Sequence, residues 1–183
     1  VGSEMCIRDR IRCLKNDNYL VLETEAQGYP VLTPYDGQLR LQAYSHLASG
    51  ALGVMYWHWH SIHNAIESYW KGVLSHDLRP NRLYKECSVI GNELKKYGHR
   101  LVNLKKTNRF AVIADNASLT GLNEFKLNNE SDSNYNTVFR WLCDALYMMN
   151  IEYDVIPADP ALFASYENIL CLLYTSPSPR DGL

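Results

Sequence analysis

The chain has 183 residues, with 18 Lys and Arg against 20 Asp and Glu, and a formal net charge of −2. A chain without a basic run lacks the electrostatic pattern of a protein that binds nucleic acid or an anionic membrane, so neither partner is expected. Its longest apolar runs are much shorter than the roughly 20 residues that a membrane-spanning helix needs.

The two ends of the chain resemble a translated sequencing adapter. The first ten residues, VGSEMCIRDR, and the string CLLYTSPSP at positions 171–179 can be encoded by the two complementary strands of one oligonucleotide. Unrelated protein ends have no reason to be related in this way, whereas a transposase adapter left on both ends of a short read has one. We therefore expect residues 1–10 and 171–183 to be artefacts and 11–170 to be a native segment, cut at both ends.

Three cysteines remain in that native segment, namely Cys13, Cys87 and Cys143. Their scattered spacing predicts reduced thiols rather than a disulfide framework, which favours a cytoplasmic location. Because the native N-terminus is expected to be missing, the sequence gives no information on a secretion signal, and export stays open.

Strand and helix patterns alternate in the first part of the native segment. An apolar run over Tyr19–Leu22 predicts a buried parallel strand that ends in Glu23, and a loop rich in Gly, Pro and Thr follows. The later predicted elements are a helix over 38–49 that stops at Gly50, a strand over Val54–Trp59 and an amphipathic helix over Leu83–Leu101 with Val89, Ile90, Leu94 and Leu101 on its apolar side. This α/β alternation predicts that residues 11–104 form the C-terminal part, strands seven and eight, of a TIM (β/α)₈ barrel.

A second α/β pattern follows a basic linker, LKKTNR. The predicted elements are strands over Phe110–Ala114 and Glu152–Ile156, a helix over Val138–Met149, an irregular loop over 123–136, and a third strand that begins at Asn168–Leu170. Residues 105–170 therefore read as the start of a doubly wound α/β domain.

Glu23 is the first candidate for chemistry, because barrel enzymes carry their catalytic groups at the carboxyl ends of the strands. A carboxylate there can attack an anomeric carbon and form a glycosyl-enzyme intermediate, with a second carboxyl as acid and then base. An ordinary strand-end glutamate, solvated or paired with Arg or Lys, is the alternative.

The stretch YWHWHSIHNAIESYW after the second strand has the composition of a sugar pocket. Its three Trp offer flat apolar faces to a sugar ring, and its His and Glu can hydrogen-bond hydroxyls. Core packing is the alternative for Trp57 and Trp59. The histidines His58, His60 and His63 could ligate a metal, but no carboxylate or Cys stands at an accepted ligand spacing, so no metal and no cofactor are expected.

The order and spacing of these motifs resemble the family 42 β-galactosidases. The matching pieces are LVLETEAQG, then GQLRLQAYSHLASGALGVMYWHW, then Glu67 eight residues after Trp59, then KGVLSHD and a helix that opens with YKE. The resemblance runs from Tyr19 to Leu104 and continues into the second domain through RFAVIADNASL.

The resemblance implies a retaining glycoside hydrolase that cleaves terminal β-D-galactosides. It implies that Glu23 is the nucleophile at the end of barrel strand seven and that Glu67, after strand eight, hydrogen-bonds the sugar. Trp57, Trp59, His60 and Trp70 are the further substrate-binding candidates. The second domain would be the flavodoxin-like or amidotransferase-like one through which these enzymes form homotrimers.

Three positions depart from the family pattern. His60 stands where an Arg is common, Trp70 stands where a His is common, and no aromatic is evident near Val31. An α-L-arabinopyranosidase is therefore an alternative. Glu25 would lie on the same side as Glu23, but it is expected past the end of the strand.

The family acid/base residue lies on strand four, outside this chain, so the 183-residue chain alone is expected to be inactive and poorly folded. Two other classes stay open. One is a non-catalytic carbohydrate-binding relative. The other is an amidotransferase-like enzyme, which would need a nucleophile on a tight turn, whereas Cys143 lies in a predicted helix.

Overall fold

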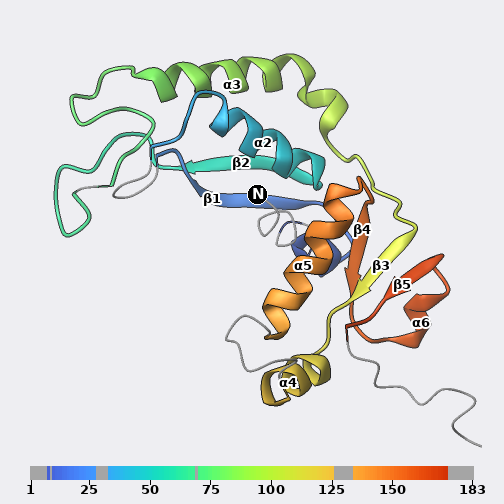
Figure 1. Cartoon of the computed structure of the whole chain (residues 1–183). Helices are drawn as coiled ribbons and strands as arrows, with labels where there is room; N and C mark the ends of the chain where they lie inside the picture. Colours follow the sequence, from blue (N-terminus) through green and yellow to red (C-terminus); the bar gives the residue numbers. More distant parts are fainter. Residues whose placement is uncertain (1–7, 9, 28–32, 69, 126–133, 173–183) are drawn as a thin grey trace, which may run out of the picture. The chain divides into compact units, whose positions relative to one another are not determined.

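A computed structural model describes residues 8, 10–27, 33–68, 70–125 and 134–172 (Figure 1). Val31 and most of the two expected adapter segments lie outside the described residues. The chain divides into two compact units, Asp17–Lys106 and a unit composed of Val1–Asn16 and Thr107–Leu183. Residues 11–16, which were assigned to the barrel segment, thus group with the second unit. Among the described residues no helix is long and apolar enough to cross a membrane.

The Asp17–Lys106 unit alternates strand and helix, as the periodicity predicts. Its elements are β1 (Tyr19–Glu25), α2 (Gln38–Ala48), β2 (Ala51–Trp57) and α3 (Arg82–Leu101), and the two strands pair in parallel. Two strand boundaries were wrong. β1 runs on to Glu25 instead of ending at Leu22, and β2 spans Ala51–Trp57 instead of Val54–Trp59.

Both helices of this unit have identifiable ends. Gly50 lies after α2 with a φ of +100°, a conformation that costs glycine least, and its N–H bonds to the Leu47 carbonyl. The side chain of Asn81 caps α3 by accepting a hydrogen bond from the N–H of Tyr84 at 2.9 Å.

The two helices cover one face of the β1–β2 pair. Their shared core consists of Leu39 and Ala43 from α2 and Leu83 and Ile90 from α3, with Tyr56 of β2 packed against it. Val89 was expected on the apolar side of α3 but is 50% exposed, because it lies one residue, about 100° around the helix, from the buried Ile90.

The second unit is a three-stranded parallel sheet with helices. Its strands have the order β4-β3-β5, with β3 (Phe110–Ile113) in the centre. The other elements are α4 (Asn116–Glu124), α5 (Tyr135–Met148), β4 (Tyr153–Ile156), α6 (Pro160–Phe163) and β5 (Asn168–Leu170). The short helices α4 and α6 were not predicted. Part of the predicted 123–136 loop lies outside the described residues. The last residues of that predicted loop belong to α5, which begins at Tyr135, three residues before the predicted start at Val138.

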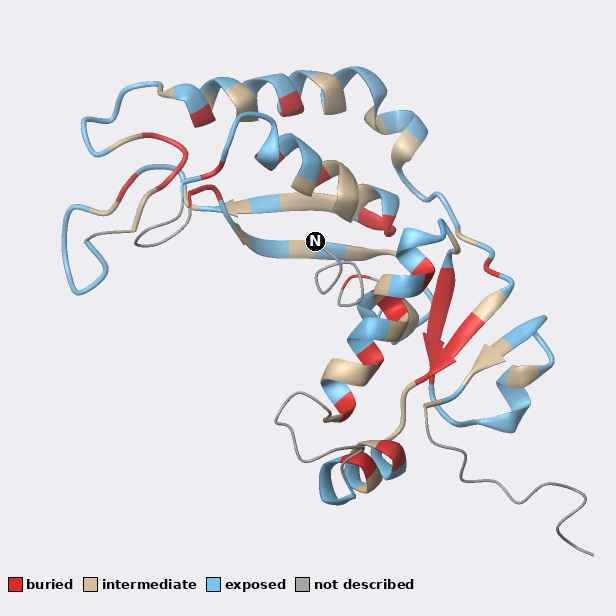
Figure 2. Cartoon of the chain, in the orientation of Figure 1, coloured by how far each residue is buried: buried red, intermediate tan, exposed pale blue. Residues whose placement is uncertain are grey.

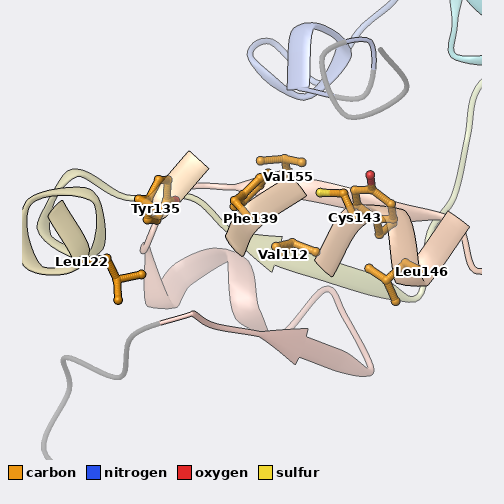
Figure 3. Packing of buried hydrophobic residues seen from close by; sticks show 8 residues of the cluster. Val112, Leu122, Tyr135, Phe139, Cys143, Leu146 and Val155 are labelled. Carbon is orange, nitrogen blue, oxygen red and sulfur yellow. The ribbon is translucent and has the colours of Figure 1, made fainter. Parts of the chain in front are cut away.

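This sheet is buried on both faces, as a parallel sheet requires. On one face α4 and α5 form a core with the strands, which includes Val112, Val155 and Phe139 (Figure 3). On the other face Ala111, Ile113 and Ile156 pack against the segment that contains α6. Alternation along β3 therefore supplies one apolar residue set to each face.

A buried carboxylate, Asp154 of β4, organises the polar part of the second unit. It pairs with Arg12, accepts hydrogen bonds from Asn108 at 2.6 Å and from Tyr166 at 2.9 Å, and lies 3.8 Å from the Cys13 thiol. Burial alone would raise the pKa of Asp154, but the hydrogen bond and charge of Arg12, with the bonds from Tyr166 and Asn108, hold it below its ordinary value.

Candidate functional site

The site begins with an irregularity in β1. The strand pairing runs from Val21 opposite Val54 to Thr24 opposite Tyr56, so β1 uses three steps where β2 uses two. One extra residue in a strand is a β-bulge, and such bulges occur at barrel rims and beside active sites, where they re-aim side chains. The bulge lies at Leu22 and Glu23.

Hydrogen bonds to α2 identify which side chains of β1 face the helices. The Tyr19 hydroxyl lies 3.3 Å from the carbonyl of His46, and Thr24 Oγ1 accepts a hydrogen bond from Gln42 at 3.0 Å. Side chains next to Thr24 along the strand point to the opposite face. Glu23 and Glu25 therefore lie on the face away from α2 and α3, and both are exposed.

The boundary of β1 corrects one expectation about these two glutamates. Glu25 was expected past the strand end, but it is the last residue of β1 and pairs with Trp57 of β2. Glu23 lies two residues before the end of the strand. The position along the strand alone therefore does not separate the two carboxylates.

The same face of the β1–β2 pair is apolar and uncovered. Leu20 is 60% exposed and Leu22 is 69% exposed, and Met55 and Trp57 of β2 are also exposed. Figure 2 shows the contrast with β3 and β4, which are largely buried. Because parallel strands are normally buried on both faces, this face has the character of an interior surface.

A loop that follows β2 carries the remaining candidates, and hydrogen bonds close its base. The N–H of Val73 donates to the carbonyl of His58 at 2.7 Å, and the N–H of Leu74 donates to the carbonyl of Trp59 at 2.8 Å. Ser61, which is fully buried, donates through its hydroxyl to Leu74 and accepts from Gly72. The base is thus ordered by backbone contacts.

The aromatic side chains of the loop region are available for contact. Trp57 is 42% exposed and Trp59 is 61% exposed in this chain. The Trp59 ring meets the edge of Tyr84 of α3 at 6.1 Å between centroids. Trp70 is half-buried, and its backbone N–H donates to the carbonyl of Glu67 at 3.0 Å.

The histidines form a chain of ring contacts. His58, His60, His63 and His76 follow one another at centroid distances of 6.4, 6.0 and 5.4 Å. Burial and the neighbouring His60 lower the pKa of His58, while the charge of Glu67 acts in the opposite direction. Within the described part of the chain no group of three or more His, Cys, Asp and Glu side chains is arranged to hold a metal ion.

His60 and Glu67 are both exposed on this loop. The Nδ1 atom of His60 lies 2.8 Å from the carbonyl of Ser61, and Glu67 acts electrostatically on His58. The structure thus places Glu67, Trp70 and His60 on one loop after β2 and Glu23 on the adjoining strand.

One further contact, which was not predicted, joins the segment after β1 to the loop after β2. Gln27, which follows β1, is buried, and its Nε2 atom donates to the carbonyl of Gly72 at 2.6 Å. No local pattern indicates such a contact, because the two residues are 45 positions apart. Gly72 itself is the one local signal, since a glycine often marks a position where another part of the backbone approaches closely.

Comparison with known proteins adds the family. A model of glycoside hydrolase family 42, described as Beta-galactosidase, matches residues 3–97, more than half of the chain. The chain is 28% identical over 129 residues to the β-galactosidase BgaH of Haloferax lucentense, covering 70% of this chain and 18% of that protein. It is 25% identical over 168 residues to the β-galactosidase LacA of Lactobacillus acidophilus, covering 88% of this chain and 25% of LacA.

Solved structures share the fold. The β-galactosidase of Bacillus circulans sp. alkalophilus superposes with a TM-score of 0.81 at 24% identity, over 93% of this chain and 26% of that one. The chain thus spans about a quarter or less of the length of these relatives. On the match over residues 3–97, the chain belongs to glycoside hydrolase family 42, the β-galactosidase family.

Proposed function

We propose that the chain is part of a retaining β-galactosidase and that Glu23 is its nucleophile. The observation that carries the proposal is the bulge in β1, which sets Glu23 near the carboxyl end of a parallel strand on the face opposite its helices. In a (β/α)₈ barrel that face is the interior, and catalytic groups project from the carboxyl ends of its strands.

The uncovered apolar face supports a barrel that is completed by other segments of a longer protein. Leu20, Leu22 and Met55 would pack in its interior, as branched and apolar residues do in such barrels. The second carboxyl of a retaining enzyme, about 5–5.5 Å from the nucleophile, would come from one of those segments. The 183-residue chain alone would then lack half of the catalytic pair.

The loop after β2 would form the sugar-binding wall. We assign hydrogen bonding of sugar hydroxyls to Glu67 and His60, and ring contact to Trp57, Trp59 and Trp70. The exposure of Trp57 and Trp59 and the ordered base of the loop support these roles. The chemistry needs no cofactor, because a carboxylate nucleophile and a carboxyl acid/base suffice.

The second unit fits the start of a flavodoxin-like domain. Its strand order, with the first strand between the second and third, is the order in which the flavodoxin-like arrangement begins. We assign this unit the role of joining subunits into a homotrimer, and we expect a cytoplasmic enzyme.

An α-L-arabinopyranosidase is the second candidate, because His60 and Trp70 stand where the family pattern commonly has other side chains. The two sugars differ at the hydroxymethyl group, so contacts to that group decide between them. Comparing kcat/KM of the complete protein on aryl β-D-galactoside and aryl α-L-arabinopyranoside separates the two candidates.

The test of the reaction class is the stereochemistry of the first product. The complete protein should release galactose first as the β-anomer, because two displacements retain configuration. NMR spectra recorded before mutarotation identify the anomer. Release of the α-anomer would contradict the nucleophile role of Glu23. Binding of galactose without hydrolysis would favour a non-catalytic carbohydrate-binding relative.

A further inference from the structure

Two loops follow the carboxyl ends of β1 and β2, and Gln27 joins them. The Gln27 side chain is buried, and its Nε2 atom lies 2.6 Å from the carbonyl oxygen of Gly72. Its neighbour Ala26 is fully buried and donates its N–H to the carbonyl of Trp57 at 3.3 Å. The segment after Glu25 is therefore fixed to β2 by its backbone and to the loop by one amide.

The acceptor, Gly72, is itself held tightly in the base of the loop. Its N–H donates to the buried hydroxyl of Ser61 at 3.1 Å. A Cβ atom on Gly72 would lie 2.5 Å from the carbonyl carbon of His60 and 2.6 Å from the carbonyl oxygen of His58. The loop backbone thus crosses itself at Gly72 with no space for a side chain, and Gln27 binds at that crossing.

We propose that Gln27 is a positioning residue for the sugar-binding loop. Gln27 follows Glu23 by four residues, and Gly72 follows Glu67 by five. The Gln27–Gly72 hydrogen bond therefore sets the distance between the strand that carries the nucleophile and the loop that carries Glu67. This inference rests on the proposed function of Glu23 and Glu67.

The position of the nucleophile has a separate support. The residues on either side of the bulge, Val21 and Thr24, pair with β2 and hold Glu23 between them, and Gln27 takes no part in this pairing. Glu67 and Trp70 are exposed or half-buried, and they lie beyond the crossing that Gln27 binds. Loss of the Gln27 amide should therefore loosen the loop and weaken sugar binding, while the reaction of bound substrate changes much less.

The first test compares Gln27→Met with Gln42→Met in the complete enzyme. Each substitution removes one side-chain amide donor. The Gln27 amide donates to Gly72 in the loop after β2, whereas the Gln42 amide donates to Thr24 on the face toward the helices. Leaving a buried carbonyl without its hydrogen-bond donor has a free-energy cost that corresponds to about a tenfold or larger change in a binding constant. Gln27→Met should raise the KM for an aryl galactoside and the inhibition constant of galactose by about tenfold, with kcat within about threefold of the parent.

Gln42→Met should leave KM and the galactose inhibition constant unchanged. Equal changes in both variants, or a KM within twofold of the parent for Gln27→Met, would overturn the positioning role. A parent that is itself inactive on the galactoside would instead contradict the proposed function, so the two failures are distinguishable.

The second test keeps the size of the side chain and uses Gln27→Glu. An ionised carboxylate cannot donate to the Gly72 carbonyl, whereas a protonated carboxyl can. Because burial raises the pKa of a carboxyl, the KM of this variant relative to the parent should fall as the pH is lowered. A relative KM that does not depend on pH would overturn the hydrogen bond as the cause. This ratio remains informative if Gln27→Met fails to fold.

Discussion

Tyr19 and Thr24 are five residues apart in β1, yet both side chains bond to α2. In a regular strand, residues an odd number of positions apart point to opposite faces. The extra residue at Leu22 and Glu23 reverses the alternation and allows both contacts. It leaves Leu22 and Glu23 together on the face away from the helices.

Exchanging Glu23 and Thr24 tests this geometry without changing the composition. The carboxylate would then face α2 at the half-buried position of Thr24, and burying a charge is costly unless it is paired. We expect the exchanged variant of the complete protein to lose hydrolysis and to unfold at a lower urea concentration. Retention of hydrolysis at the parental rate would show that the two positions share a face.

Gly72→Ala should destabilise the loop after β2. The added methyl group would meet the backbone of His58 and His60 at 2.5–2.6 Å, and backbone atoms cannot move aside as a flexible side chain can. Overpacking of this kind costs about 1–3 kcal/mol. Urea unfolding measures the loss, and limited proteolysis within 61–72 should become faster.

Gly91→Ala is the matched control, since apart from the chain neighbours and the local backbone of α3 nothing lies within 4 Å of a Cβ at Gly91. A helix interior favours Ala over Gly by about 1 kcal/mol, so this variant should be at least as stable as the parent. Equal destabilisation of both variants would contradict the crossing at Gly72.

Asp154→Asn should destabilise the second unit, because it removes the counterion of the buried Arg12. Breaking a buried ion pair costs about 3–5 kcal/mol. The pKa of Asp154 is below its ordinary value in the folded chain, so its stabilisation is present above the unfolded pKa of about 3.9 and is lost as the pH falls through the folded pKa.

The measurement is urea unfolding of the parent and of Asp154→Asn between pH 7 and pH 3. The difference in free energy of unfolding should stay constant above about pH 5 and shrink below it. A difference that grows toward low pH would contradict the ionised state of Asp154.

The 183-residue chain alone should not hydrolyse an aryl galactoside. Its β1–β2 face exposes Leu20 and Leu22, and exposed apolar surface of this kind promotes association. Light scattering during size-exclusion chromatography should show oligomers or aggregates. A monomeric, active preparation would contradict the proposal that other segments complete the barrel and supply the acid/base.

Much of the fold could be predicted where the local pattern of an element matches its burial. The pattern of β1 does not match, because Leu20 and Leu22 predicted a buried strand but are 60% and 69% exposed in this chain. The helical spacing of Leu39 and Ala43 indicated α2, and both residues are buried. The helices α4 and α6 were missed although Asp115 and Asp159 cap them, and Pro160 at the start of α6 is a typical signal. Short helices have too few residues for a periodic pattern.

The site was predictable in part. Glu23 and the loop after β2 were proposed as site candidates from the sequence, since strand ends and aromatic clusters are local features, and their roles stay predictions. The bulge was not, because register depends on the partner strand. The Gln27–Gly72 contact was not predictable either, because the folded backbone alone brings these two residues together.

The most direct test of the nucleophile is Glu23→Ala in the complete protein, with Glu25→Ala as the matched control on the same strand face. We expect Glu23→Ala to lower kcat for an aryl β-D-galactoside by on the order of 10⁶-fold, as removal of a catalytic nucleophile does elsewhere. Glu25→Ala should retain most of the activity. Near-parental hydrolysis by Glu23→Ala, or a larger loss in Glu25→Ala, would contradict the assignment.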